Sequence, residues 1–504
     1  MSDDTRSADD TRIEPISSGL AELDELLNGG FVRGRTYLVQ GVSGTGKSLL
    51  GQHFLQAGLD AGETVVYIHG EESSDDIIAN ARQLGVDIEG SEFLDIGPGT
   101  DFFAEDISYD LVETAEVESE RFTKDIKEVI ETVQPERVLL DPITQLQYVE
   151  RDEYQYRKRL QSLIRFLRDR TVTTVATRTV SRGPGQDYVH DDFESLSDGV
   201  IKLRLDDSER RITVPKHRGL GQVDGTHGLE IRQDGLEIYP QVVPKQTDRE
   251  FDPSLLSTGD DAFDALLGGG IEGSSVLFLS GPTGVGKSTV GAELLNGIAD
   301  QGGNILVYLF EESIDQFTYR CENLGIPITE LREAGHLQLT EVEPLVQSAE
   351  EFNHHVVSEV DATDPEAVLI DGLAGYRISI QGESERLVRR LHGLTRVLKD
   401  RGVATLITDQ ADDITGVPKA TSTNTSYIAD SIVYLTYVEL EGELARAIGV
   451  LKKRLGGFDN RFHRFQISDG IGLQIQGPFD GVHGIMKGTA FERSQRDPSP
   501  DSQP

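Results

Sequence analysis

The sequence repeats itself at a spacing of 240 residues. The positions that align without a gap are Gly19 with Gly259, Asp24 with Asp264, Lys47 with Lys287, and Glu71 with Glu311. A repeat of this length is itself large enough to be a domain. A chain of 504 residues also exceeds what one hydrophobic core usually organises. The sequence therefore predicts two domains of one fold.

Each half alternates short apolar runs with helical patterns. The apolar runs are 37–39, 64–68, 138–140 and 174–176 in the first half, and 276–279, 305–309, 368–370 and 404–407 in the second. Runs of this kind are typical of strands that are buried on both faces. We therefore predict an α/β fold with two tandem domains, each a mainly parallel sheet with helices on both faces.

Polar segments without periodicity indicate the boundaries. The stretch from Tyr239 to Pro253 contains proline and no regular apolar spacing, so we place a linker at 241–253. The first domain is then 11–240 and the second 254–490. We expect disordered tails at 1–10 and 491–504.

A glycine-rich phosphate loop, GxxxxGK[ST], follows the first strand of each half. Its backbone N–H groups and the next helix N-terminus can cradle a phosphate, and its lysine can reach the β- and γ-phosphates. Two such loops in the same register make a chance match negligible, so we predict two P-loop NTPase sites that bind ATP. The expected nucleotide-binding residues are Gly41, Ser43, Gly44, Thr45, Gly46, Lys47, Ser48 and Leu49, and Gly281, Thr283, Gly284, Val285, Gly286, Lys287, Ser288 and Thr289.

Two kinds of acidic residue follow the loops in both halves. Asp141 and Asp371 end apolar strands, the Walker B position, where a carboxylate holds Mg²⁺. A strand-end aspartate can also simply form a turn. The paired context favours a metal site, with Ser48 and Ser288 as further Mg²⁺ ligands.

Glutamate pairs end the strand that follows each loop helix. They are Glu71 with Glu72 and Glu311 with Glu312. A carboxylate there can orient or deprotonate an attacking hydroxyl, and a like-charged neighbour tends to raise its pKa. The alternative is two solvated acids in an acidic protein. Their equal position in both repeats favours catalysis.

A basic cluster lies late in each half. The clusters are Lys216, His217 and Arg218, and Lys452, Lys453 and Arg454. They are either ordinary surface charge or, if the domains form a ring, cations that reach the γ-phosphate of a neighbouring subunit.

Composition limits the partners and the compartment. With 48 basic and 87 acidic residues, the chain carries a net charge of −39, which repels nucleic acid, and we find no concentrated basic patch. One cysteine, Cys321, excludes an internal disulfide, and no apolar run approaches bilayer length. We expect a cytoplasmic protein that binds no membrane. The excess of acid also suits a saline cytosol.

The sequence resembles the KaiC family of double-domain RecA-superfamily ATPases over nearly its whole length outside the tails. The resemblance rests on both loops, both glutamate pairs, both Walker B acids and the Lys-x-Arg elements, and on the segment from Tyr427 through Glu439 to Ile448. It implies RecA-like domains, ATP-dependent hexameric rings of identical subunits, ATP hydrolysis in the first domain, and a serine/threonine autokinase with reverse transfer in the second. With the acidic composition, it indicates an archaeal, halophilic member with a regulatory or signalling role.

The resemblance also assigns individual residues. The family's two phospho-acceptors, a serine and then a threonine, fall on Ser426 and Tyr427, so only the serine is kept. Arg446 and the two basic clusters fall on its contacts between subunits. The chain has no tryptophan to hold adenine, and Pro142 and Gly372 follow the Walker B acids where the family has a small hydroxyl residue.

Two other functions remain open at this point. A RecA-type recombinase or helicase would need cationic DNA-binding loops, but the candidate stretches 181–186 and 412–416 carry one cation and none. A nucleotide-gated scaffold would hydrolyse little ATP and would signal through its assembly state.

Overall fold

The computed structural model describes most of the chain. The described residues are 13–97, 123–145, 153–180, 192–206, 209–244, 254–344, 346–378, 384–410, 425–440, 442–479, 482–483, 485 and 491–492. The chain divides into two compact units, residues 1–241 and 242–504. The expected N-terminal tail, most of the expected linker and both candidate DNA-binding stretches lie outside the described residues.

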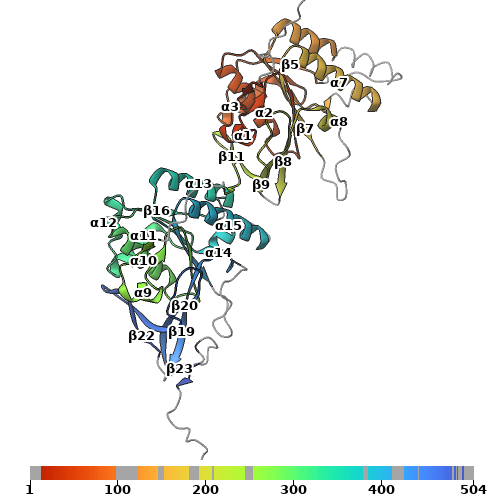
Figure 1. The fold of residues 1–504 in the computed structure, drawn as a ribbon. Helices are drawn as coiled ribbons and strands as arrows, with labels where there is room; N and C mark the ends of the chain where they lie inside the picture. Colours follow the sequence, from red (N-terminus) through yellow and green to blue (C-terminus); the bar gives the residue numbers. More distant parts are fainter. Residues whose placement is uncertain are drawn as a thin grey trace, which may run out of the picture. The chain divides into compact units, whose positions relative to one another are not determined.

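The first domain is built on a nine-stranded sheet in the order β11-β10-β9-β8-β3-β7-β6-β4-β5 (Figure 1). The strands are β3 (Thr36–Gly41), β4 (Val65–His69), β5 (Glu92–Asp95), β6 (Arg137–Asp141), β7 (Thr173–Thr179), β8 (Gly199–Asp206), β9 (Glu209–His217), β10 (His227–Arg232) and β11 (Gly235–Tyr239). Strands β3 to β8 pair in parallel, and β8 to β11 pair antiparallel. The predicted mainly parallel sheet is therefore confirmed, and it carries an antiparallel extension.

The second domain repeats this topology in the order β16-β15-β17-β18-β14-β19-β20-β21-β22. Its strands are β14 (Val276–Gly281), β15 (Ile305–Leu309), β16 (Leu337–Glu341), β17 (Ala367–Asp371), β18 (Ala404–Gln410), β19 (Ser431–Leu440), β20 (Glu443–Lys453), β21 (His463–Ser468) and β22 (Gly472–Pro478). Each strand corresponds to one in the first domain, so the duplication seen in the sequence is a duplication of the whole fold.

Helices cover both faces of each sheet (Figure 1). In the first domain they are α1 (Ala21–Leu26), α2 (Lys47–Asp60), α3 (Ser74–Gln83), α7 (Glu153–Asp169) and α8 (Asp192–Leu196). Alternate residues of β3 enter different cores: Tyr37 and Val39 pack with Phe54 of α2, whereas Leu38 packs with Ile164 of α7. The apolar strands are thus buried on both faces, as predicted.

The second domain has the same two cores. Its helices are α9 (Asp261–Leu266), α10 (Lys287–Ala299), α11 (Ile314–Asn323), α12 (Ile328–Glu333), α13 (Ala349–Thr363), α14 (Leu373–Ile378) and α15 (Ser384–Asp400). Leu277 and Leu279 pack on the α10 side, and Phe278 packs on the α15 side. No helix within the described ranges is both long and apolar enough to cross a membrane.

Short two-stranded sheets lie outside the main sheets. β1 (Pro15–Ile16) pairs with β2 (Phe31–Val32), and β12 (Leu255–Leu256) pairs with β13 (Ile271–Glu272). β23 (Val482–His483) pairs with β24 (Phe491–Glu492). Backbone pairing therefore extends two residues into the segment that we expected to be the C-terminal tail.

Candidate functional site

Each phosphate loop connects the central strand of its sheet to a helix. The first loop joins β3 to α2, and the second joins β14 to α10. Gly46 and Gly286 stand at the helix N-caps with φ of +93° and +112°, a conformation that disfavours other residues. Neither N-cap uses a side-chain hydrogen bond, so the first helical N–H groups are available to an anion.

Because the loop glycines have no Cβ, they leave room for a side chain from the antiparallel strands. A side chain at Gly46 would meet Leu236 Cδ2 of β11 at 3.1 Å, and one at Gly286 would meet Ile467 Cδ1 of β21 at 2.4 Å. In both domains an apolar residue of these outer strands therefore lies directly over the start of the loop helix.

The loop lysines donate to carbonyls of their own loops. Lys47 Nζ donates to the Val42 carbonyl at 2.9 Å, and Lys287 Nζ donates to the carbonyls of Gly281 and Pro282 at 2.9 and 3.0 Å. Burial lowers the pKa of both lysines, and nearby carboxylates, Asp141 for Lys47 and Glu311 for Lys287, oppose this shift. A phosphate entering the loop would supply the anion that favours the charged amine.

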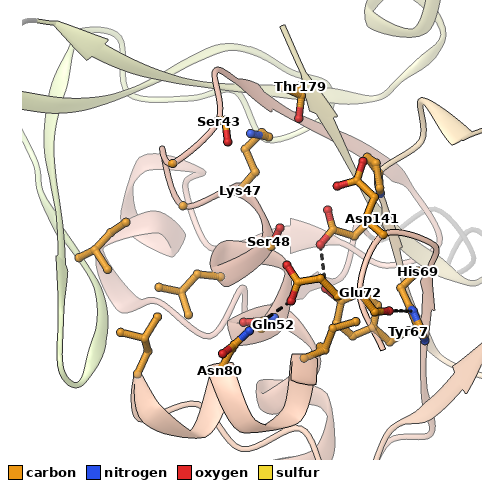
Figure 2. Close-up of a pocket in the computed structure, with 18 residues that line it drawn as sticks. Ser43, Lys47, Ser48, Gln52, Tyr67, His69, Glu72, Asn80, Asp141 and Thr179 are labelled. Carbon is orange, nitrogen blue, oxygen red and sulfur yellow. Dashed lines mark hydrogen bonds between the residues drawn. The ribbon is translucent and has the colours of Figure 1, made fainter. Parts of the chain in front are cut away.

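The Walker B aspartates have different partners in the two domains. In the second domain Asp371 Oδ1 accepts from Ser288 Oγ at 2.9 Å and from Thr408 Oγ1 at 2.7 Å. In the first, Asp141 accepts from the hydroxyl of Tyr67 at 2.7 Å (Figure 2). It also accepts from the hydroxyl of Thr177. Burial raises the pKa of Asp371, and the two hydroxyl donors limit the rise.

These oxygen ligands fit Mg²⁺. The ion prefers hard oxygen ligands and is usually held by one or two protein oxygens together with phosphates and water. The Ser288 hydroxyl and the Asp371 carboxylate already lie side by side in the second domain. Within the described residues there is no group of three or more His, Cys, Asp or Glu that would form an all-protein metal cage.

The glutamate pairs face the loops but have different supports. In the first domain Asn80 Nδ2 donates to Glu72 Oε2 at 3.2 Å (Figure 2). In the second, Arg320 forms an ion pair with Glu312 and also donates to Thr289 Oγ1 at 2.9 Å. Partial burial, and then the charge of Asp371, raise the pKa of Glu311, while Lys287 opposes the rise.

A cavity of about 370 Å³ at the first loop brings most of these groups together (Figure 2). It is lined by Ser43, Gly44, Gly46, Lys47, Ser48, Leu49, Gln52, Tyr67, His69, Glu71, Glu72, Ile77, Asn80, Leu84, Asp141, Pro142, Thr179 and Ile231. Polar groups lie at the loop, and Leu49, Ile77, Leu84 and Ile231 form apolar walls. This pattern suits a ligand with a charged end and a flat apolar end.

Strand alternation divides each basic cluster. His217 and Lys453 point into their own domains: His217 is hydrogen-bonded to the Tyr37 hydroxyl at 3.2 Å, and Lys453 forms a buried ion pair with Glu272 at 2.8 Å. Successive residues of a strand point to opposite faces, so a run of three cations cannot act as one surface. The contact of the clusters with another subunit stays a prediction, and the side chains of the outer members of each cluster are the ones that could make it.

The first lysine of each cluster donates to the backbone just before the strand that pairs with its own: the end of α8 before β8, and the turn before β19. Lys216 Nζ donates to the carbonyl of Glu194 at 2.7 Å, and Lys452 Nζ donates to those of Ser426 and Ala429, both at 2.7 Å. Ser426 is partly buried in this turn, and Tyr427 is exposed.

Arg446 lies elsewhere. It pairs in register with Tyr437, three residues beyond the last residue of β19 that is in register with β14. In the first domain Arg210, six residues before Lys216 as Arg446 is before Lys452, donates to the Gly44 carbonyl of its own loop at 3.2 Å. For Arg446 itself, the contact with another subunit that the resemblance implies stays a prediction.

Several site residues escaped the sequence analysis. Tyr67, His69, Thr177, Thr408 and Arg320 have no motif, because their role depends on which face of a strand or helix meets the loop. His69 is bonded to the Glu72 carbonyl at 3.0 Å and to Ser74 Oγ at 2.9 Å, so it fixes the turn that carries the glutamate pair.

Comparison with known proteins agrees with this geometry. A family model described as "ATPase: KaiC" matches residues 16–243 and 256–478. The chain is 30% identical over 486 residues to the circadian clock oscillator protein KaiC of Parathermosynechococcus lividus, covering 94% of this chain and 87% of that protein. It is 30% identical over 497 residues to its counterpart in Thermostichus vulcanus, covering 95% and 92%, and 29% identical over 497 residues to that of Acaryochloris marina, covering 95% and 91%.

Proposed function

Because the chain belongs to the KaiC family of ATPases, we propose that it binds Mg-ATP at both loops, hydrolyses it, and phosphorylates its own Ser426 in the second domain. It acts as a cytoplasmic ring of identical subunits, with the hexamer as the expected size. Its role is regulatory, as the names of its clock-protein relatives suggest.

One observation carries the proposal: each sheet gathers one complete set of ATPase groups at a single edge. The Walker B aspartate and the glutamate pair lie at the carboxyl ends of two neighbouring parallel strands, β6 with β4 and β17 with β15. The loop with its lysine and serine follows the carboxyl end of β3 or β14, on the other side of β7 or β18 in the same sheet. Open α/β sheets bind their ligands at the carboxyl ends of the strands.

The chain's own residues divide the work. The loop N–H groups and the lysine hold the phosphates and stabilise charge that develops during transfer. Glu71 and Glu311 orient the attacking oxygen and accept its proton. Mg²⁺, when bound by the serine and aspartate oxygens, neutralises phosphate charge.

The basic clusters favour action between subunits. Each lies beside the start of its loop strand: Lys216 pairs with Val200 of β8, and Lys452 pairs with Ile432 of β19. Arg218 and Arg454 extend further, to Asp198 and Asp430 beside the first residues of β3 and β14. The loop begins at the other end of these strands, about 16 Å away for five residues. Cations at the amino end of the loop strand are better placed to reach the nucleotide of a neighbouring subunit than the nucleotide of their own domain.

The same argument applies to Ser426. Its backbone is held by Lys452 four residues before Asp430, whose N–H donates to the Val276 carbonyl at the start of β14. Glu311 follows β15 at the opposite edge. Transfer to Ser426 therefore takes place between subunits, with the Glu311 of one chain serving the serine of the next.

Incubation with ATP labelled at the γ-phosphate tests both activities. We expect released phosphate and label on Ser426. Glu311→Gln should slow labelling by 10² to 10⁴, the usual contribution of a general base, while ATP remains bound. Ser426→Ala should abolish labelling, whereas Ser431→Ala, which removes a buried hydroxyl five residues away, should not. Hydrolysis without label on the protein would reduce the chain to an ATPase, and absence of both would refute the proposal.

A further inference from the structure

Each domain contains one buried aspartate that contacts two cations. In the first domain Asp198 Oδ2 lies 2.5 Å from NH2 of Arg168, and its Oδ1 lies 3.9 Å from NH1 of Arg218. In the second domain Asp430 Oδ2 lies 2.7 Å from Nζ of Lys399, and its Oδ1 lies 3.3 Å from NH1 of Arg454. The arrangement is the same in both repeats, although these residues belong to none of the motifs of the sequence analysis except Arg218 and Arg454.

The same carboxylates bind the strands that lead to the phosphate loops. The N–H of Thr36, the first residue of β3, donates to Asp198 Oδ2 at 3.2 Å. The N–H of Val276, the first residue of β14, donates to Asp430 Oδ2 at 2.9 Å. Each aspartate therefore joins three parts of its domain: the start of the loop strand, the C-terminal end of a long helix, and the outermost arginine of the basic cluster.

We propose that Asp198 and Asp430 are positioning residues that hold Arg218 and Arg454 for contact with the nucleotide of the neighbouring subunit. This inference rests on the proposed action between subunits. The aspartate side chains are 8% exposed, whereas those of the two arginines are 54% and 48% exposed. Each guanidinium thus lies against its buried carboxylate on one side and is about half exposed, so a part of its fork of N–H donors can face a neighbour.

A purely structural role does not account for the second cation. Each buried carboxylate already has a cation within 2.7 Å and a backbone N–H donor, which together satisfy its charge. An additional half-exposed ion pair contributes little stability. The helix-end cation also changes from Arg168 to Lys399 between the repeats, whereas the outer residue is arginine in both. Arginine offers a planar fork of donors that lysine lacks, and this fork matches a phosphate.

Further contacts order the held arginine. The backbone N–H of Arg218 donates to the Asp198 carbonyl, and that of Arg454 donates to the Asp430 carbonyl, both at 2.9 Å. Arg454 NH2 also donates to the Tyr427 carbonyl at 2.6 Å. The backbone bonds fix where each arginine leaves the strand, and the two side-chain bonds of Arg454 also set the direction of its guanidinium. Less ordering then remains for the transition state.

The test uses full-length rings in which one domain is silenced. In a Lys287→Ala background, Asp198→Asn keeps an oxygen acceptor for the Thr36 N–H but loses the charge that holds Arg218. We expect kcat for hydrolysis in the first domain to fall about tenfold or more, with KM for ATP changed less than about twofold, because the arginine acts on charge that develops in the transition state. Asp430→Asn in a Lys47→Ala background should do the same in the second domain.

Matched controls separate positioning from stability. Glu131→Gln makes the same acid-to-amide change at the nearby Arg170 pair, and Asp361→Asn does so at the Arg401 pair; both should leave kcat unchanged. Subunits carrying Asp198→Asn, mixed with Lys47→Ala subunits, should regain part of the activity, because some boundaries then pair an intact loop with a held arginine. If Asp198→Asn does not fold, Asp198→Glu keeps the charge but displaces it, and we expect the same fall in kcat.

The outcomes are distinguishable. Full activity in Asp198→Asn, or in a folded Asp198→Glu if that variant is needed, together with inactivity of Arg218→Ala, would overturn the positioning role alone. Full activity in Arg218→Ala would overturn the proposed action between subunits and this inference with it. A fall in kcat that Arg168→Gln reproduces in full, with a matching fall in the unfolding midpoint, would make Asp198 a structural brace and would also overturn the inference.

Discussion

In the first domain the Walker B carboxylate of Asp141 is held by Tyr67 and Thr177, whereas in the second that of Asp371 is held by Ser288 and Thr408. The repeat explains the difference, because Tyr67 aligns with Val307 at the 240-residue spacing. The loop serine bonds the aspartate in the second domain, while a tyrosine of the neighbouring strand bonds it in the first.

A second difference lies beneath the loop helices. His53 of α2 accepts the N–H of Leu236 at 3.1 Å, and Glu293 of α10 accepts the N–H of Leu473 at 3.0 Å. The backbone donor is equivalent in both repeats. The acceptor is a histidine, which becomes positive when it is protonated, in the first and a glutamate, which becomes negative when it loses its proton, in the second. The comparison shows that the shared backbone fixes the position of an N–H group that needs a hydrogen-bond acceptor. The residue that supplies this acceptor differs between the two copies.

The largest expected effect comes from the two loop lysines. Lys47→Ala and Lys287→Ala each remove the cation that stabilises phosphate charge, so hydrolysis in the altered domain should fall on the order of 10³-fold. Each single variant should also lose one class of nucleotide site. Equilibrium dialysis with radiolabelled ATP measures this, and unchanged stoichiometry in both variants would refute the existence of two independent sites.

The next effect concerns stability against acid. Burial lowers the pKa of His53 to about 4 from its ordinary value of 6.5. Between these values the unfolded chain binds a proton that the folded domain excludes, so the first domain should lose up to about 3 kcal/mol as pH falls from 7 to 4. Burial instead raises the pKa of Glu293, with Asp260 adding to the rise and the Leu473 N–H opposing it. Its contribution is present at low pH and is lost as pH rises through the raised pKa.

Urea unfolding at several pH values measures this contrast. Limited proteolysis follows the unfolding, because the peptides released show which domain has unfolded. His53→Gln keeps a neutral acceptor and should flatten the acid sensitivity of the first domain. Glu293→Gln should remove the opposite trend in the second. The comparison fails if the first domain of His53→Gln remains as acid-sensitive as the unaltered protein.

The smallest effect separates the two Walker B environments. Tyr67→Phe removes one hydrogen bond to Asp141, worth about 1 kcal/mol, so hydrolysis in the first domain should change by about five- to tenfold. The second domain should be unaffected. Tyr308→Phe is the matched control, because its buried hydroxyl bonds Glu359 on the other side of the sheet. Equal effects of the two substitutions would show that Tyr67 acts only through packing.

The apolar runs in the sequence predicted four of the six parallel strands of each sheet, and the repeated motif predicted where both phosphate loops lie between a strand and a helix. The sequence did not predict the antiparallel extension that β9 to β11 add to β8, or the one that β20 to β22 add to β19. Those strands are partly exposed, so their apolar residues do not form the continuous runs that mark the doubly buried strands. The motif gave Asp141 but not Tyr67, because the run from Val65 to His69 is apolar enough on both faces to hide which side meets the loop.

The alternation of side chains within the basic clusters could have been predicted from the sequence, although it was not. Three consecutive cations looked like one surface, yet they follow strands whose side chains alternate. Applying that period would have separated Lys453 from Lys452 and Arg454. The ion pair of Arg320 with Glu312 is different, since it requires knowing how α11 packs on the loop helix.

The side chains of the outer strands that cover Gly46 and Gly286 have an evolutionary consequence. Ile231 and Leu236 reach the first loop helix, Ile231 lines its cavity, and Ile467 reaches the second loop helix. None of these residues belongs to the phosphate loop. A mutation there would alter the apolar wall over the loop helix and leave the loop sequence unchanged. After a duplication, the apolar residues over each loop helix could therefore change in one copy while the phosphate loop of that copy stays the same.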